Sequence, residues 1–196
     1  MGKLAVNGIE YEIIKLLGKG KGGYSYLAKK LSKNGDKADA AGKDFPKIDA
    51  PVVLKQIHHE PCDYYNFGNK IEAERHDYHR LSEAGIRVPR MIDIDMENER
   101  IVKEFIDGPT VFELVRDGDG EIDKELFSQV RQMADQAKNA GLNIDYFPTN
   151  FVLQGGLLYY VDYECNPYSD QWNFENWGIK YWWRSPEFLD YLKSHE

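Results

Sequence analysis

The sequence predicts a two-lobed α+β fold, and the order of its segments carries this prediction. Short apolar or β-branched segments dominate the chain up to residue 106, and segments with helical spacing dominate the remainder. A small hairpin around Gly155 and Gly156 lies within the second half. With 196 residues, of which 42% are hydrophobic, the chain can bury the core of one domain or of two small lobes.

The first predicted strands flank a cluster of glycines. YEIIKLL (11–17) is apolar and β-branched at its centre, and YSYLAKKL (24–31) resumes a strand pattern after the glycines, which predicts a hairpin. The segment 32–50 is rich in Gly, Asp and Lys and is expected to form an exposed loop. PVVLKQI (51–57) is expected to form a third strand.

The middle of the chain alternates between helix and strand signals. Helical spacing covers 65–85, and Gly85 is a typical stop signal. The segments RMIDIDM (90–96) and RIVKEFI (100–106) predict a pair of strands joined by a short turn.

Helices are expected to form most of the second half. The segment 110–116 predicts a short helix, and 122–142 a longer one with apolar Leu126, Val130, Met133 and Ala137 on one face. The aromatic tail from Asn173 onward is expected to be helical, with its Trp residues buried as core anchors.

Composition and charge argue against a membrane-spanning, a secreted and a nucleic-acid-binding protein. The chain lacks an apolar run near the roughly 20 residues of a membrane span, and its N-terminus lacks a signal-peptide core. Two cysteines do not make a disulfide framework, so a reduced, cytoplasmic compartment is expected. A formal net charge of −8 argues against binding nucleic acid through a general basic surface.

Three features of the first half could contribute to a nucleotide site. Gly18, Gly20 and Gly23 would let backbone N–H groups approach phosphate oxygens, although an ordinary hairpin turn explains them as well. Lys55 lies in an apolar strand, where burial requires an anion, unless the strand is an edge and the lysine is solvated. Glu74 could hold that lysine, but a helical Glu by itself is usually only solvated.

The segment NIDYFPTNFVLQGGLLYYVDYE (143–164) surrounds one hairpin with two carboxylates and an amide. Asp145 precedes the hairpin, Asn150 follows five residues later, and Asp162 ends the second arm. This spacing suits an Asp that orients a hydroxyl, together with an Asn and a second Asp that hold a metal against phosphates. Taken separately, each residue is equally typical of a turn or a strand end.

With these motifs the chain resembles the protein-kinase-like superfamily over about residues 11–166. LGKGKGGYSYLA resembles the glycine loop, VVLKQI the strand with the ATP lysine, IVKEFIDGPTVFELV the hinge, DYFPTN the catalytic loop and VDYE the metal-binding strand end. The resemblance implies a small β-rich N-lobe (1–106) and a truncated helical C-lobe (107–196).

The resemblance also implies Mg²⁺ and ATP as cofactors and gives each candidate residue a role. Gly18, Gly20, Gly23 and Lys55 would bind ATP, as would the backbone of Glu104 and Ile106 at adenine. Glu74 would pair with Lys55, Asp145 would be the catalytic residue, and Asn150 and Asp162 would hold the metal.

The departures from the family pattern shape the expected function. Asn143 and Phe147 replace a typical His and Lys of the catalytic loop, and Asp162-Tyr163-Glu164 replaces Asp-Phe-Gly. VDYE is similar to the choline kinases and aminoglycoside phosphotransferases, but only 34 residues follow Asp162. The short C-lobe is similar to minimal kinases of the RIO and lipopolysaccharide-kinase types.

We therefore expect an atypical serine/threonine protein kinase that transfers the γ-phosphate of Mg-ATP to a hydroxyl acceptor. Two alternatives stay open: a small-molecule kinase, suggested by VDYE, and a non-catalytic nucleotide-binding scaffold, suggested by the substituted catalytic loop. A structural zinc is a minor further alternative, because its ligand types occur close together in the sequence at His58, His59, Cys62, His76 and His79. We expect no nucleic-acid or membrane partner.

Overall fold

A computed structural model describes residues 2–31, 50–61, 68–118 and 123–195. The chain divides into two compact units, one made of residues 1–73 and 90–105, the other of residues 74–89 and 106–196. Each unit is described by itself below. The lobes expected at 1–106 and 107–196 stay a prediction. The loop expected over 32–50 and Cys62 of the zinc alternative fall outside the described residues, apart from residue 50.

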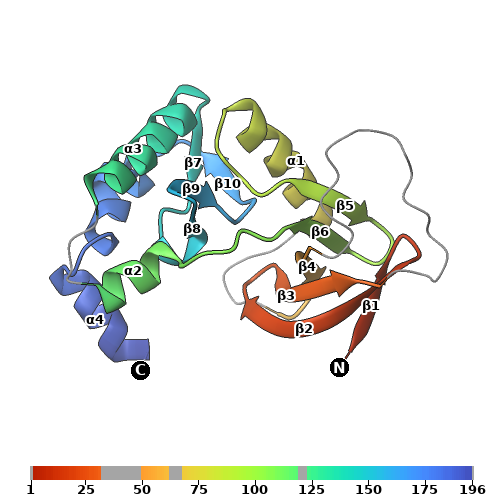
Figure 1. Ribbon diagram of the computed structural model, residues 1–196. Helices are drawn as coiled ribbons and strands as arrows, with labels where there is room; N and C mark the ends of the chain where they lie inside the picture. The colour runs from red at the N-terminus through yellow and green to blue at the C-terminus, as the bar shows by residue number, and fades with distance from the viewer. Residues whose placement is uncertain (1, 32–49, 62–67, 119–122, 196) are drawn as a thin grey trace. The chain divides into compact units, whose positions relative to one another are not determined.

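The first unit contains a six-stranded antiparallel sheet with the strand order β1-β2-β3-β4-β6-β5 (Figure 1). Its strands are β1 (Lys3–Val6), β2 (Ile9–Lys19), β3 (Gly23–Lys30), β4 (Val52–Ile57), β5 (Met91–Asp95) and β6 (Arg100–Glu104). The strands predicted at 11–17, 24–31, 51–57, 90–96 and 100–106 are thereby confirmed.

One strand of this sheet, β1, was not predicted. Asn7 and Gly8 form the turn between β1 and β2 with φ values of 46° and 79°. Such positive values suit the two central residues of a tight hairpin turn, for which Asn-Gly is the preferred pair. The dipeptide was therefore the signal that could have identified β1 from the sequence.

The core of the sheet comes from alternating residues of neighbouring strands. Its buried members are Val6, Tyr11, Ala28, Val52, Leu54 and Val102. Because successive side chains of a strand point to opposite faces, Val52 and Leu54, two residues apart on β4, both reach this cluster. Lys55 is adjacent to Leu54 on β4 and therefore faces the other side of the sheet.

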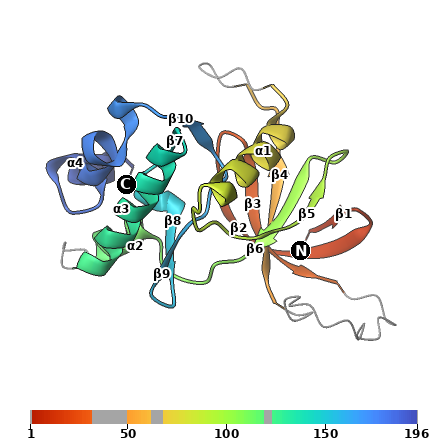
Figure 2. The same cartoon turned by 90° about the horizontal axis from the view of Figure 1, so that it is seen from above.

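The second unit is mainly helical and contains two short strand pairs. Its elements are the later turns of α1 (Lys70–Glu83), then α2 (Val111–Asp117), α3 (Lys124–Asn139), β7 (Leu142–Ile144), β8 (Phe151–Gln154), β9 (Leu157–Tyr160), β10 (Cys165–Pro167) and α4 (Pro186–His195). β8 pairs with β9 and β7 with β10, both antiparallel. Figure 2 shows α3 alongside this hairpin.

Local sequence signals explain the helices and the hairpin. Thr110 and Glu113 form a capping box at the start of α2, and Asp123 caps α3. The predicted apolar face of α3 is confirmed, since Leu126, Val130, Met133 and Ala137 are all buried. Gly155 and Gly156 have φ values of 58° and 80°, which close the predicted β8–β9 hairpin in a tight turn.

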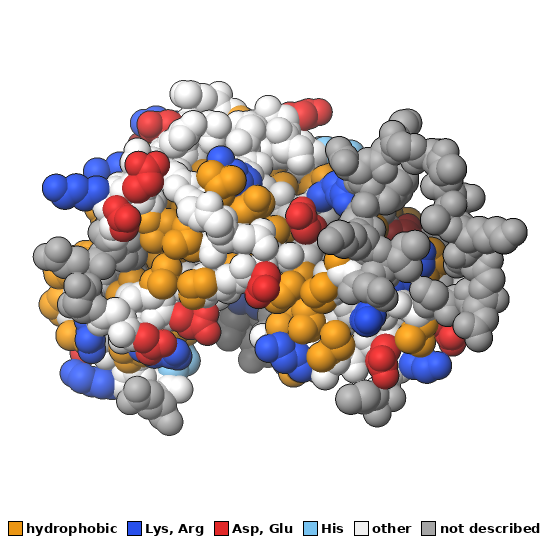
Figure 3. All heavy atoms as spheres, in the orientation of Figure 1, with side chains coloured by type: hydrophobic (Ala, Val, Ile, Leu, Met, Phe, Trp, Pro, Cys, Tyr) orange, Lys and Arg blue, Asp and Glu red, His pale blue; other side chains and the backbone are white. Residues whose placement is uncertain are grey.

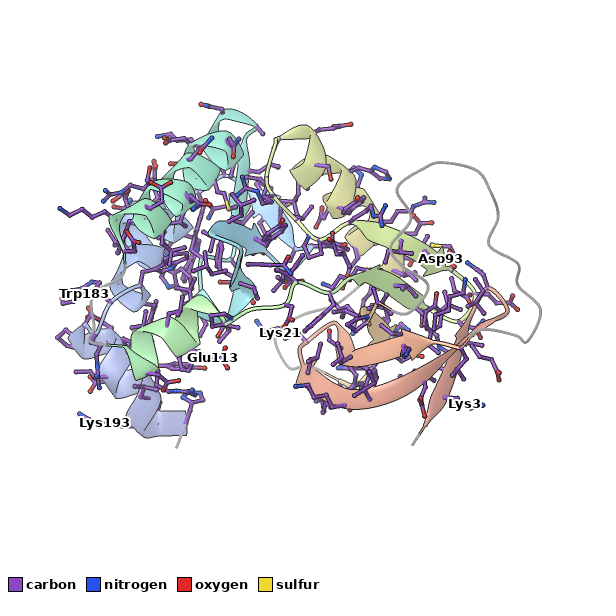
Figure 4. The ribbon with its side chains drawn as sticks, in the orientation of Figure 1. Lys3, Lys21, Asp93, Glu113, Trp183 and Lys193 are labelled. Carbon is purple, nitrogen blue, oxygen red and sulfur yellow. The ribbon has the colours of Figure 1, made fainter. Side chains whose placement is uncertain are left out.

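The tail corrects the expectation that its Trp residues are all core anchors. Trp182 is fully buried and its Nε1–H donates to the Tyr146 carbonyl at 2.7 Å, but Trp183 is 47% exposed. Neighbouring residues of a helical turn project in different directions, so Trp182 and Trp183 do not share the core. Figure 4 shows Trp183 on the outer side of the second unit. The tail is helical in part, with short 3₁₀ and π turns before α4.

The described residues contain no helix long and apolar enough to cross a membrane. On the face drawn in Figure 3, acidic and basic side chains of the described residues are interspersed rather than gathered by sign.

Candidate active site

The loop after β7 places Asp145 and Asn150 close together. β7 is buried, and Asp145 follows it as an exposed residue. The Asp145 Oδ1 atom accepts a hydrogen bond from the Phe147 N–H at 3.0 Å, which tightens the loop, and Pro148–Asn150 form a 3₁₀ turn. The Asn150 side-chain Nδ2–H then donates to the Asp145 carbonyl at 3.3 Å. The predicted catalytic loop is therefore a compact turn with both polar side chains on it.

The end of the β8–β9 hairpin brings Asp162 to this turn. The Val161 N–H donates to the Asn150 carbonyl at 2.8 Å, and Asp162 is the next residue. The Asp162 Oδ1 atom accepts from the Tyr163 N–H at 2.8 Å, which orients the carboxylate. The structure thus brings together Asp145, Asn150 and Asp162 within the second unit, as the sequence predicted.

The side chains around Asp162 fit a hard divalent cation. Mg²⁺ prefers oxygen ligands and is usually held by one or two carboxylates plus phosphate oxygens and water. Asp162 supplies a carboxylate, and Asn150 supplies an amide whose nitrogen is engaged with the Asp145 carbonyl, so its oxygen is the atom available to a cation. The described residues contain no group of three or more His, Cys, Asp or Glu side chains suited to a metal, so phosphate oxygens and water would have to complete the coordination.

The loop that follows Asp162 is anchored on residues of the same unit. The Tyr163 hydroxyl donates to the Pro89 carbonyl at 2.6 Å, and its ring lies 4.9 Å from that of Tyr78. The Asp77 Oδ2 atom accepts from the Cys165 N–H at 3.2 Å. Burial raises the pKa of the Cys165 thiol to about 12, so it is a structural residue and not a nucleophile at neutral pH.

The three candidate glycines, Gly18, Gly20 and Gly23, differ in how closely their neighbours approach them. A Cβ at Gly23 would lie 2.5 Å from the Gln56 carbonyl oxygen, so packing of β3 on β4 requires this glycine. A Cβ at Gly18 would meet nothing within 4 Å, and one at Gly20 only the Gly23 carbonyl oxygen at 4.0 Å. The space beside Gly18 and Gly20 is therefore uncrowded, although the Gly20 N–H already donates to the Gly23 carbonyl at 2.9 Å, whereas Gly23 is explained by the sheet.

His58 and Lys70 together hold the turn at Gly20–Gly22, a role that the sequence did not predict. The carbonyls of three successive residues, Gly20, Lys21 and Gly22, accept hydrogen bonds from His58 Nε2 at 3.0 Å, Lys70 Nζ at 3.3 Å and the His58 N–H at 3.3 Å. The Lys70 ammonium also donates to the His58 carbonyl at 2.6 Å. These hydrogen bonds hold the carbonyls of Gly20, Lys21 and Gly22 toward His58 and Lys70.

Lys70 is expected to stabilise the first unit through its hydrogen bonds to two backbone carbonyls. It is only 5% exposed, and Lys70→Met keeps much of its length while removing the donor to two carbonyls. Loss of hydrogen bonds to a charged group should lower the free energy of unfolding by about 1.5–3 kcal/mol in chemical denaturation. The matched variant Lys30→Met alters an exposed lysine of β3 and should change it by less than about 0.5 kcal/mol. Equal stability of the two variants would contradict the structural role.

Lys55 and Glu74, the predicted ion pair, lie in different units. Lys55 is half-buried on β4, opposite Ser25 of β3 and Ile101 of β6. Glu74 is half-buried on α1 and belongs to the second unit. The ion pair between them stays a prediction.

A second lysine lies on the same sheet face as Lys55. Val53 is opposite Lys103, and Lys55 is opposite Ile101, so the two lysines are diagonal neighbours on one face of β4 and β6. Lys103 is only 6% exposed, and a buried ammonium requires an anion or several acceptors. Sequence reasoning could have singled out Lys103, because it lies inside an apolar segment, as Lys55 does.

The predicted hinge residues lie where the chain passes from the first unit to the second. Glu104 ends β6, its N–H donates to the Arg90 carbonyl at 2.9 Å, and its Oε2 atom accepts from the Arg90 N–H at 3.2 Å. Ile106 is buried and begins the second unit. Their contacts to adenine stay predictions.

Comparisons with known proteins extend this picture. A scan against models of protein families finds none that matches the chain. The KEOPS complex subunit Bud32 of Pyrococcus abyssi is 27% identical over 92 residues, which are 46% of this chain and 42% of that protein. A solved structure of the BubR1 kinase domain matches with a TM-score of 0.57 and 18% identity, covering 83% of this chain and 48% of that one.

The structural match confirms the predicted fold class. A β-rich N-terminal sheet followed by a largely helical C-terminal part is the arrangement shared with that kinase domain. The chain spans less than half the length of each of these two proteins.

Proposed function

We propose that this chain, which has a protein-kinase-like fold, is an ATP-dependent phosphotransferase that delivers the γ-phosphate of Mg-ATP to a hydroxyl acceptor. The observation that carries the proposal is the meeting of Asp145, Asn150 and Asp162 on two hydrogen-bonded loops. The fold and the distant similarity to Bud32 support it. An ordinary hairpin needs neither two carboxylates nor an amide at this end.

Each residue of the trio would have a distinct task. Asp162 and Asn150 would hold Mg²⁺, which when bound neutralises charge on the phosphate oxygens. Asp145 would accept or orient the proton of the acceptor hydroxyl. In the first unit, the uncrowded space beside Gly18 and Gly20 would accommodate phosphates, and Lys55 would contact them.

We favour a protein as the acceptor, and hence an atypical serine/threonine kinase. The second unit has a cavity of about 760 Å³, but it is lined by residues of α3 and the tail, among them Lys124, Phe127, Arg131 and Trp183, and not by the catalytic trio. That cavity would not hold a small acceptor beside Asp145. A small-molecule kinase is the alternative, favoured by the Asp162-Tyr163-Glu164 sequence.

Mg²⁺-dependent ATP binding is the first expected result. At about 100 times its dissociation constant, a ligand that binds only the folded state adds roughly 2.7 kcal/mol to the free energy of unfolding. Thermal unfolding should therefore shift upward with ATP and Mg²⁺ together, and less with ATP plus EDTA. No Mg²⁺-dependent shift at millimolar ATP would overturn the proposal, whereas binding without phosphoryl transfer to any protein would favour a nucleotide-binding scaffold.

A further inference from the structure

A groove lies along a face of α3 that the candidate active site does not use. It has a volume of about 760 Å³ and is open rather than enclosed. Its lining residues include Lys124, Phe127, Arg131 and Asp135 of α3, together with Ile179 and Trp183 of the tail. The four α3 residues are spaced by three or four positions, so they share one face of the helix, and this face is separate from the buried face of Leu126 and Val130.

The bottom of the groove is apolar and is supported by the core beneath it. Phe127 is half-buried, and its ring centroid lies 6.3 Å from those of Phe174 and Trp182 in the core of the second unit. Ile179 also packs against this core. Trp183 is 47% exposed at the groove, although Trp182 next to it is completely buried. A large exposed ring beside a supported apolar surface is typical of a place where another molecule binds, because binding removes that apolar area from water.

Two cations line the same groove. Lys124 and Arg131 are seven residues apart on α3, which separates them by two turns, or about 10 Å along the helix axis. Within the described part of the chain, Lys124 forms no ion pair. The Arg131 Nε–H donates to Glu175 Oε1 at 3.1 Å, and the guanidinium lies over the Phe127 ring, 5.9 Å from its centroid. A guanidinium carries five N–H donors and this hydrogen bond uses one, so Arg131 can also bind a carboxylate of another molecule.

The sign of these charges differs from that of the chain as a whole. The formal net charge of the chain is −8, whereas the groove is lined by two cations and, at the far end of its α3 side, by the carboxylate of Asp135. Arg184, which directly follows Trp183 and is exposed, adds a further cation to the tail, and Glu175 offsets part of the charge of Arg131. Charge therefore favours an acidic partner at the end of the groove with Lys124 over other positions on an acidic chain.

The dimensions of the groove suit a stretch of polypeptide. Lys124 and Asp135 are eleven residues apart, or about 16 Å along the helix axis. An extended chain covers that length with about five residues, at roughly 3.3 Å each. A ligand of the size of one amino acid or one sugar does not span the two cations.

We propose that this groove docks an extended acidic segment of another protein. Carboxylates of the segment would bind Lys124 and Arg131, and an apolar side chain between them would pack against Phe127 and Trp183. The lining residues do not include the trio of the candidate active site, so docking does not depend on phosphoryl transfer.

The experiment is an NMR titration of the ¹⁵N-labelled full chain, without nucleotide, with three synthetic hexapeptides. Each has a central Leu-Leu followed by two Ser, and the pair before Leu-Leu is Glu-Glu, Ser-Ser or Lys-Lys. The Glu peptide should shift the amide signals of residues 124–135 and 179–183 and should bind roughly tenfold more tightly than the Lys peptide, since exposed ion pairs each contribute only modestly. Added salt should reduce this difference.

A charge reversal tests the role of the two cations. The double variant Lys124→Glu with Arg131→Glu should prefer the Lys peptide over the Glu peptide, by a similar factor. Both residues are exposed in the structure, so the fold should tolerate the change. A misfolded variant would lose both peptides and could not reverse the preference.

Trp183→Ser tests the apolar contact. This variant should weaken the binding of the Glu peptide at least about fivefold, the effect of removing a large apolar contact. The matched control is Trp172→Ser, because Trp172 is 50% exposed, lies just before the tail and is not among the lining residues. It should bind the Glu peptide like the parent.

Four results would overturn the proposal. These are the absence of shifts at millimolar Glu peptide, equal affinity for the three peptides, shifts confined to residues outside the groove, and equal loss of binding in Trp183→Ser and Trp172→Ser. Shifts of the groove signals with Mg²⁺-ATP alone, or with rising protein concentration alone, would assign the groove to a small anion or to a second copy of the chain, and would also overturn it. Failure of the proposed phosphotransferase function leaves the peptide titration unchanged, so the two failures are distinguishable.

Discussion

Asp162→Asn is expected to abolish Mg²⁺-ATP binding and phosphoryl transfer together. Asn retains the shape of the side chain and an oxygen that can accept from the Tyr163 N–H, so the loop should keep its conformation. What disappears is the carboxylate charge. A hard cation beside the phosphates depends on that charge, since Mg²⁺ sites in nucleotide enzymes rest on only one or two carboxylates.

Isothermal titration with Mg²⁺-ATP and an ATPase or autophosphorylation assay on the same preparation measure both effects. Asp190→Asn is the matched control, because Asp190 is a strongly exposed carboxylate of α4 in the same unit. It should bind and turn over like the parent. Unchanged affinity in Asp162→Asn would show that the residue is not a metal ligand.

Asp145→Asn is expected to separate binding from catalysis. The Asn side chain can still accept the Phe147 N–H, and Asn150 and Asp162 are untouched, so Mg²⁺-ATP affinity should stay near that of the parent. Loss of a general base typically costs on the order of 10²–10⁴ in rate. We therefore expect kcat to fall by that factor with little change in the dissociation constant of Mg²⁺-ATP.

The pair of variants is more informative than either alone. Asp162→Asn should lose binding and rate, and Asp145→Asn should lose rate only, in the same titration and transfer assays. If Asp145→Asn turns over like the parent, Asp145 is not catalytic, or the measured turnover is background from a nucleotide-binding scaffold. The first outcome contradicts the role given to Asp145, and the second contradicts the enzyme assignment.

Much of the fold could be predicted because its signals are local. The Gly155-Gly156 turn, the Thr110 capping box and the apolar face of α3 each lie within a few residues of sequence. β7 and β10 were not predicted, since three-residue strands carry no periodicity and exist through their pairing with each other. The Trp residues of the tail were wrongly treated alike because composition does not tell which of two neighbours faces the core.

The candidate site was predictable to the extent that it is contiguous in sequence. Asp145, Asn150 and Asp162 fall within one short segment, so the hairpin that joins them is sufficient to bring them together. Lys70 escaped prediction because its role consists of hydrogen bonds to the backbone carbonyls of Lys21 and His58, which are distant from it in sequence. The type of a side chain does not indicate which distant backbone carbonyl it will contact in the fold.

The most direct test of the central claim is an NMR titration in which Mn²⁺ replaces Mg²⁺ with ATP. A paramagnetic ion broadens the amide signals of residues close to it, so it locates the metal without any mutation. The account predicts selective loss of the Asp145, Asn150 and Asp162 amide signals, with those of α4 remaining sharp, and no such loss with Mg²⁺-ATP. Broadening that spares these three residues, or that appears equally across the chain, would contradict it.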